Sequence, residues 1–188
     1  MNSDVSSIIS RHDPGQWSRT LPYRPKADLP YDPSRIPPAA SLLFDATVYI
    51  DQLKGDLPKP VVDLVAARTV LHGAPALAEL AVTIGALKPN DRRTAATLIP
   101  IIEMLTRINL SRIIVPNYEI WLEAAVIAGI LARTQSIPKQ DRRKFLSDTL
   151  LFLQAAAADA VMVSRNSRDL DLLLQIKPRV GVLLYDKS

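Results

Sequence analysis

The chain contains no cysteine and only two histidines, His12 and His72, among its 188 residues. The lack of cysteine excludes disulfide bonds, thiolate metal sites and a cysteine nucleophile. Two histidines are too few for most histidine-based metal sites. No apolar run approaches the roughly 18 residues of a membrane-spanning helix. The first residues also lack a cationic start followed by an apolar stretch, so we expect no signal peptide, no membrane association and a cytoplasmic protein.

Composition is that of a folded, basic domain. Hydrophobic residues make up 48% of the chain, which suffices for a substantial core. The net charge of +4 suits a polyanionic partner without identifying one. Seven of the fifteen prolines fall within residues 1–40, where no apolar periodicity is present. We therefore expect a proline-rich extension, extended or irregular, over residues 1–40 and a folded domain over residues 41–188. The aromatic residues of the extension favour packing along the surface of its own domain or of a partner.

From residue 41 onward, short β-like runs alternate with helical ones. Such alternation predicts an α/β fold of three layers, α/β/α, with a mostly parallel central sheet of about four to five strands. The expected strands are Leu42–Asp45, Thr69–Gly73, Arg112–Val115, Val161–Ser164 and Val180–Leu184. The expected helices are Val48–Leu53, Pro58–Ala67, Pro75–Leu87, Asp91–Ile108 (capped by Asn90), Pro116–Arg133, Asp141–Asp159 and Ser167–Leu174.

Three acids stand nearly alone in apolar sequence. Asp45 is the only charged residue in Ser41–Ile50, Glu79 in Ala74–Leu87 and Asp148 in Phe145–Ala158. A buried carboxylate costs several kcal/mol unless it is paired or binds a metal, and these segments contain no Lys or Arg. Each acid alone has a simple alternative interpretation as a helix cap or a surface residue. Taken together, they favour a divalent cation and metal-dependent phosphodiester chemistry.

The predicted topology offers a reason for these acids to meet. Functional groups of open α/β sheets gather beyond the carboxyl ends of the strands. Asp45 lies at the end of the first expected strand, and Asn166 and Asp169 follow the fourth. Glu79 and Asp148 lie on apolar sides of expected helices. We therefore expect the acids to converge at one edge of the sheet.

These segments together resemble the PIN-domain family, which includes the VapC-type toxin ribonucleases. The resemblance covers about Leu42 to Asp186 and rests on LLFDATVYI, on GAPALAEL and on LSDTLLFLQAAAADAVMVSRNSRDLDLL. It implies a PIN-like fold and a metal-dependent ribonuclease using Mg²⁺ or Mn²⁺. It further implies regulation by a small antitoxin and a homodimer. The metal-site acids that it implies are Asp45, Glu79, Asp148 and Asp169, with Thr47 and Asn166 as polar helpers.

The chain departs from the family pattern in details. Ala46 replaces a hydroxyl residue, Ser164 replaces Thr and Leu170 replaces Phe. Asp171 competes with Asp169 for the role of the fourth acid. No primary carboxylate is lost, so the expectation of metal binding stands.

Basic residues near the expected site are candidates for binding RNA phosphates. They are Arg142, Arg143 and Lys144 before Asp148, and Arg165 and Arg168 beside Asn166. Their contribution would be independent of RNA sequence and sensitive to salt. The alternative interpretation is that they are solvated residues at the starts of helices.

Three other functions are compatible with the sequence. The first is a PIN-like RNA-binding or interaction module without catalysis, and the second is a housekeeping RNA-processing nuclease. The third is a haloacid-dehalogenase-like phosphatase, because LLFDATV resembles an Asp-x-Asp motif; that motif needs a second acid where Thr47 stands. The sequence contains no nucleotide-binding GxxxxGK[ST] or GxGxxG motif.

Overall fold

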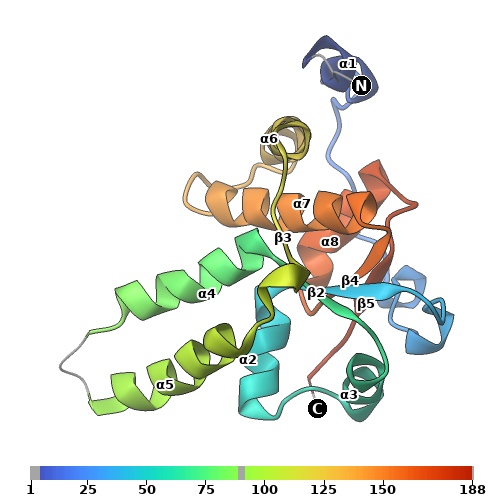
Figure 1. Ribbon diagram of the computed structural model, residues 1–188. Helices are drawn as coiled ribbons and strands as arrows, with labels where there is room; N and C mark the ends of the chain where they lie inside the picture. Colours follow the sequence, from blue (N-terminus) through green and yellow to red (C-terminus); the bar gives the residue numbers. More distant parts are fainter. Residues whose placement is uncertain (1–4, 89–91, 188) are drawn as a thin grey trace.

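Five parallel strands form the central sheet in the order β3-β2-β1-β4-β5 (Figure 1). The computed structural model describes residues 5–88 and 92–187. The strands are β1 (Ser41–Phe44), β2 (Val70–Gly73), β3 (Ile113–Ile114), β4 (Ala160–Ser164) and β5 (Val182–Leu184). The expected α/β/α architecture is confirmed, and the sheet is parallel throughout rather than mostly parallel.

The centre of the sheet is buried on both faces. In β4 every residue is buried, and in β1 all but the first are. Parallel strands covered by helices on both sides are continuous apolar runs without polar alternation. This explains why LLF and VMV are visible as strands in the sequence. The register pairs Phe44 with Val163, so β1 and β4 end side by side.

Helices cover both faces of this sheet. In Figure 1, α2 and α3 lie on one side and α6 and α7 on the other. The helices are α1 (Val5–Arg11), α2 (Ala46–Lys54), α3 (Lys59–Ala66), α4 (Ala74–Ala86), α5 (Arg92–Arg107), α6 (Tyr118–Thr134), α7 (Arg142–Ala157) and α8 (Ser167–Ile176), with short 3₁₀ turns η1 (Lys26–Asp28), η2 (Pro33–Arg35) and η3 (Leu110–Arg112). Among residues 5–88 and 92–187, no helix combines the length and hydropathy of a transmembrane span.

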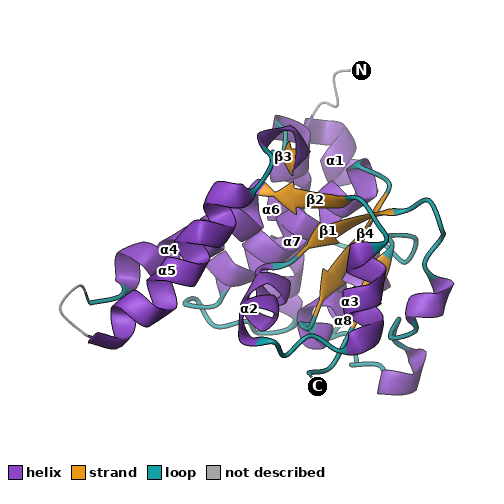
Figure 2. Cartoon of the chain, turned by 60° about the horizontal axis from the view of Figure 1, so that its bottom comes forward, coloured by secondary structure: helices purple, strands orange, loops and turns teal. Residues whose placement is uncertain are grey.

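Helices α4 and α5 form a hairpin that projects away from the sheet (Figures 1 and 2). Each expected helix is present here within a residue or two of its bounds. The expected cap Asn90 and the expected first residue Asp91 lie outside the described residues. The base of α4 follows β2 directly, which places this helix beside the carboxyl edge of the sheet.

The proline content predicts an extended or irregular N-terminal segment, but part of this segment (residues 5–40) is helical. Helix α1 forms at its start and buries Ile8 while packing against α6. A helix of seven residues with one buried side chain has no apolar repeat to detect, because tertiary packing stabilises it. The remainder follows the surface of its own chain, as expected. Thr20 donates to the carbonyl of Thr134 and Leu184 donates to that of Pro30.

Candidate metal centre

Three carboxylates from distant parts of the chain meet at the carboxyl edge of the sheet. Asp45 ends β1, Glu79 lies on α4 and Asp148 lies on α7. One oxygen of each lies within 4.8 Å of the others. Asp45 and Asp148 are both 2% exposed, and Glu79 is partly buried. The convergence expected from the sequence is therefore present for these three acids.

Asp45 is held in place by hydroxyl groups rather than acting as a helix cap. Its backbone occupies the N-cap position of α2, but its side chain makes no capping hydrogen bond. Instead its Oδ2 accepts from Thr47 Oγ1 at 2.8 Å and from Ser164 Oγ at 2.6 Å. Thr47, which we expected to support the acids, therefore contacts Asp45 directly. Ser164 supplies the hydroxyl that the family pattern places on Thr.

Asn166 joins the cluster to a fourth acid. Its side-chain nitrogen Nδ2 donates to Asp148 at 2.9 Å and to Asp169 at 2.8 Å. Its side-chain oxygen accepts from the backbone N–H of Asp169, which caps α8. Asn166 thus connects Asp169 to Asp148 through hydrogen bonds, while Asp169 lies outside the group formed by Asp45, Glu79 and Asp148.

Asp171 occupies a separate environment. Its carboxylate accepts from the backbone N–H of Arg24 at 2.8 Å and from Arg24 Nε at 2.5 Å. The Asp171 side chain is 2% exposed, so the ion pair compensates a buried charge. Of the two acids, Asp169 is the one that hydrogen bonds connect to the cluster.

Burial and mutual repulsion raise two pKa values in the cluster. Burial raises the pKa of Asp148 well above its ordinary value, and the charges of Asp45 and Asp169 raise it further. Burial also raises the pKa of Glu79, and Asp45 adds to the shift. Lys144 opposes both shifts without cancelling them. Burial is therefore the larger cause of both raised pKa values, and the like charges of the neighbouring carboxylates add to it.

The donor set fits a hard divalent cation. Carboxylate oxygens are the ligands that Mg²⁺ and Mn²⁺ prefer, and Mg²⁺ keeps several waters, so a few acids suffice. A cation here would compensate Asp45, Glu79 and Asp148 together. Asp169 would remain connected to this ion's ligands through the hydrogen bonds of Asn166.

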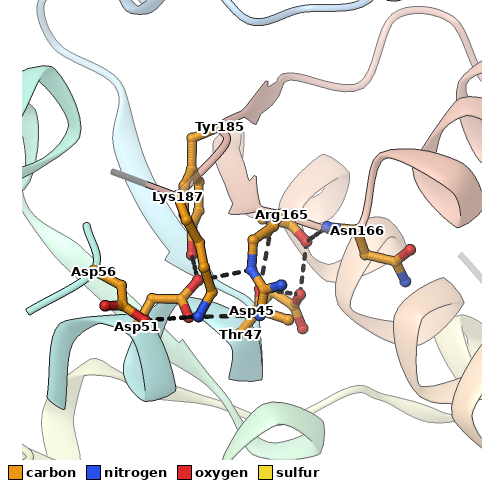
Figure 3. A network of polar contacts seen from close by, with 9 residues as sticks. Asp45, Thr47, Asp51, Asp56, Arg165, Asn166, Tyr185 and Lys187 are labelled. Carbon is orange, nitrogen blue, oxygen red and sulfur yellow. Dashed lines mark hydrogen bonds and ion pairs between the residues drawn. The ribbon is translucent and has the colours of Figure 1, made fainter. Parts of the chain in front are cut away.

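The two basic residues beside Asn166 make different contacts. Arg165 Nε donates to Asp51 Oδ2 at 2.8 Å, and Figure 3 shows this side chain between Asp45 and Asp51. Its backbone N–H donates to Thr47 Oγ1. Arg168 is exposed as well, and its Nε donates to the hydroxyl of Tyr23.

Asp51 is a buried acid that the sequence analysis missed. It also accepts from Tyr185 and Lys187, and Lys187 bridges to Asp56 (Figure 3). Burial alone would raise the pKa of Asp51, but these hydrogen bonds outweigh it and lower the pKa. The one available signal was its spacing, because Asp51 lies three residues after Val48 on the buried face of α2.

A groove opens beside the acids between α4 and α7. Its volume is about 700 Å³, and Glu79 lines it from α4 while Lys144 lines it from α7. Arg143 and Trp121 also line it. Arg142, by contrast, donates to the carbonyl of Ile137 and does not line this groove. Two of the expected basic residues therefore line the same groove as Glu79.

Comparisons with solved structures support the fold. A chain of VapBC2 from Rickettsia felis, crystallised with a DNA fragment from its promoter, superposes with a TM-score of 0.54 at 15% identity, covering 78% of this chain and 99% of that one. A chain of FitAB bound to IR36 DNA gives 0.50 at 17% identity, covering 76% and 94%. A chain of VapBC-1 from nontypeable Haemophilus influenzae gives 0.50 at 17% identity, covering 77% and 97%.

No family model and no curated protein matches the sequence. The likeness is therefore one of structure at low identity. It shows that the fold is PIN-like and of the VapC type, as the resemblance implied.

Proposed function

We propose that this protein is a ribonuclease that hydrolyses RNA phosphodiester bonds with the help of Mg²⁺ or Mn²⁺. The observation that carries the proposal is the meeting of Asp45, Glu79 and Asp148 within 4.8 Å at the carboxyl edge of a PIN-like sheet. Two of these acids are buried, and none has an ion-pair partner among the described residues. A divalent ion held there would activate water and stabilise charge on the scissile phosphate.

The residues of the chain divide this work. Asp45, Glu79 and Asp148 would bind the ion, and Asp169 would bind a second ion or orient water. Thr47 and Ser164 fix one oxygen of Asp45. Asn166 fixes Asp148 and Asp169 relative to each other. Such supporting hydrogen bonds set the orientation and the basicity of metal ligands.

The groove beside Glu79 provides a place for the substrate. Arg143 and Lys144 put two positive charges at its α7 side, where RNA phosphates would lie. Arg142 lies one residue before them, and Arg165 is held by Asp51 on α2. We propose that these cations and Arg168 draw RNA toward the acids.

We further propose that the nuclease is the toxin of a toxin-antitoxin pair. The structural neighbours are components of the VapBC2, FitAB and VapBC-1 complexes. This chain exposes Val82, Val115, Tyr118 and Trp121, apolar side chains around the groove and on α6. A small antitoxin or a second copy of the chain would cover such a surface. We expect an antitoxin and a homodimer as partners of a cytoplasmic enzyme.

The phosphatase alternative has no support at the site. The position of its second acid is Thr47, whose hydroxyl donates to Asp45. A PIN-like module without catalysis, or a housekeeping nuclease without an antitoxin, would be revealed by the experiment below.

Cleavage of labelled RNA by the purified, partner-free protein tests the proposal. We expect cleavage with Mg²⁺ or Mn²⁺ and none after EDTA or in Asp45→Asn. Asp56→Asn is the matched control, because Asp56 is a partly buried acid that pairs with Lys187 outside the cluster. Full activity of Asp45→Asn, or activity that survives EDTA, would exclude the proposed nuclease. If the protein cleaves RNA but no inhibitor protein is encoded beside it or co-purifies with it, the housekeeping nuclease is favoured over the toxin.

A further inference from the structure

The N-terminal segment contacts an arginine at the rim of the candidate metal centre. Arg168 Nε donates to the hydroxyl of Tyr23 at 2.8 Å, across 145 positions of sequence. The guanidinium carbon also lies 4.9 Å from the centre of the Tyr23 ring. A hydrogen bond and a cation–π contact therefore act on the same side chain.

Tyr23 is itself anchored on both sides. The next residue, Arg24, pairs with the buried Asp171, and the carbonyl of Pro22 accepts from Gln175 at 3.0 Å. Arg168, Asp171 and Gln175 are spaced by three and four residues, so they lie along one face of α8. Residues 22–24 thus follow this helix face and cannot shift without breaking the Asp171 ion pair.

The contact with Tyr23 leaves much of the arginine available. Only Nε of Arg168 donates to a protein group in the part of the chain that the structure describes, and the side chain is exposed. The two terminal nitrogens can therefore meet a phosphate, for which the planar guanidinium is well suited. Arg165, by contrast, donates hydrogen bonds from Nε and one terminal nitrogen to the buried Asp51.

The position of Arg168 connects it to the carboxylates. It lies in the first turn of α8, directly before Asp169 and two residues after the capping Asn166. A phosphate bound there would belong to the same RNA strand that reaches the acids. Tyr23 is 46% exposed, so its ring also borders this surface.

We infer that the N-terminal segment is part of the RNA-binding surface, with Tyr23 a positioning residue that fixes Arg168 for contact with an RNA phosphate. This inference rests on the proposed function. Fixing a long side chain before binding lowers the entropy lost when the complex forms. Removing Tyr23 should therefore weaken binding only through Arg168.

RNA binding by variants in the inactive Asp45→Asn background tests the inference. The probe is a fluorescent single-stranded RNA, titrated at several salt concentrations. Arg168→Ala should weaken binding about fivefold to tenfold and reduce the salt slope by about 1, as expected for one lost phosphate contact. Tyr23→Leu should weaken binding about threefold, in keeping with one side chain left unfixed. The double variant should bind no more weakly than Arg168→Ala alone.

Lys26→Ala is the matched control, because Lys26 lies in the same segment but pairs with Asp186, and among the described residues it forms no hydrogen bond or ion pair with α8. It should bind RNA like the parent, and thermal unfolding should show that all variants are folded. An unchanged salt slope in Arg168→Ala, or additive losses in the double variant, would overturn the inference. Cleavage by the unmodified protein is measured separately. If the unmodified protein cleaves RNA but the Tyr23 and Arg168 variants bind RNA like the parent, only the inference is refuted. If the variants show the expected, non-additive losses of RNA binding but the unmodified protein does not cleave RNA, only the nuclease proposal is refuted.

Discussion

Ser164 Oγ donates a 2.6 Å hydrogen bond to Oδ2 of Asp45, although 119 residues separate the two in sequence. The bond follows from the pairing of β1 with β4, whose ends lie side by side. Thr47 donates to the same oxygen, so Oδ1 has no hydrogen bond to the described residues. We propose that Oδ1 is the Asp45 oxygen that would bind a metal ion.

Removing the Ser164 hydroxyl should therefore weaken metal binding without removing a ligand. We expect Ser164→Ala to lose about 10-fold or more in Mn²⁺ affinity, the effect typical of lost support for a metal ligand. Ser164→Thr keeps the hydroxyl and should restore affinity. Isothermal titration with Mn²⁺ measures both variants, and equal affinity of Ala and Thr would contradict the supporting role.

Metal binding should depend on pH in a definite direction. The pKa values of Asp148 and Glu79 are raised, chiefly by burial, so protons compete with the ion above the ordinary carboxyl range. Mn²⁺ affinity should fall as pH is lowered from 7 toward about 5, with protons released on binding. Titrations in buffers of different ionisation enthalpy count these protons. Metal binding that releases no protons at acidic pH would contradict the raised pKa values.

The buried charge of Asp51 should matter for stability more than that of its neighbour Asp56. Asp51 is fully buried and accepts from Arg165, Tyr185 and Lys187. We expect Asp51→Asn to lower the free energy of unfolding by ~2–3 kcal/mol, and Asp56→Asn by less than ~1 kcal/mol because its pair is more exposed. Urea unfolding compares the two. Equal losses would contradict this account of the network.

The contact of the N-terminal segment with Glu123 should add to the free energy of unfolding, and this addition should be lost at low pH. A hydrogen bond from His12, together with Lys177, lowers the pKa of Glu123 to about 2. Because the folded-state pKa lies below the unfolded value, this contribution is present above about pH 4.5 and is lost as pH falls toward 2. It amounts to roughly 3 kcal/mol and is shared between His12 and Lys177.

Glu123→Gln should therefore flatten the dependence of unfolding free energy on pH over that range. Glu103→Gln is the control, since Glu103 forms an exposed pair with Arg107 on α5. A pH dependence unchanged in Glu123→Gln would show that this contact does not hold the segment.

Local sequence patterns predicted most of the sheet and the three acids that meet at its edge, for physical reasons. Apolar runs reveal strands buried on both faces, and a single acid within such a run reveals a charge that needs compensation. Long-range pairings leave no such trace. Arg165 with Asp51, and Arg24 with Asp171, join residues 114 and 147 positions apart, and either arginine alone reads as an ordinary surface cation. Helix α1 was missed because one buried residue, Ile8, makes no periodic pattern.

The measurement that bears most directly on the metal centre is the anomalous scattering of Mn²⁺ in crystals of this protein. The account predicts a peak bounded by the carboxylates of Asp45, Glu79 and Asp148, which vanishes in Asp45→Asn. A Mn²⁺ peak only elsewhere in the protein, or no peak between these three carboxylates at saturating Mn²⁺, would contradict it.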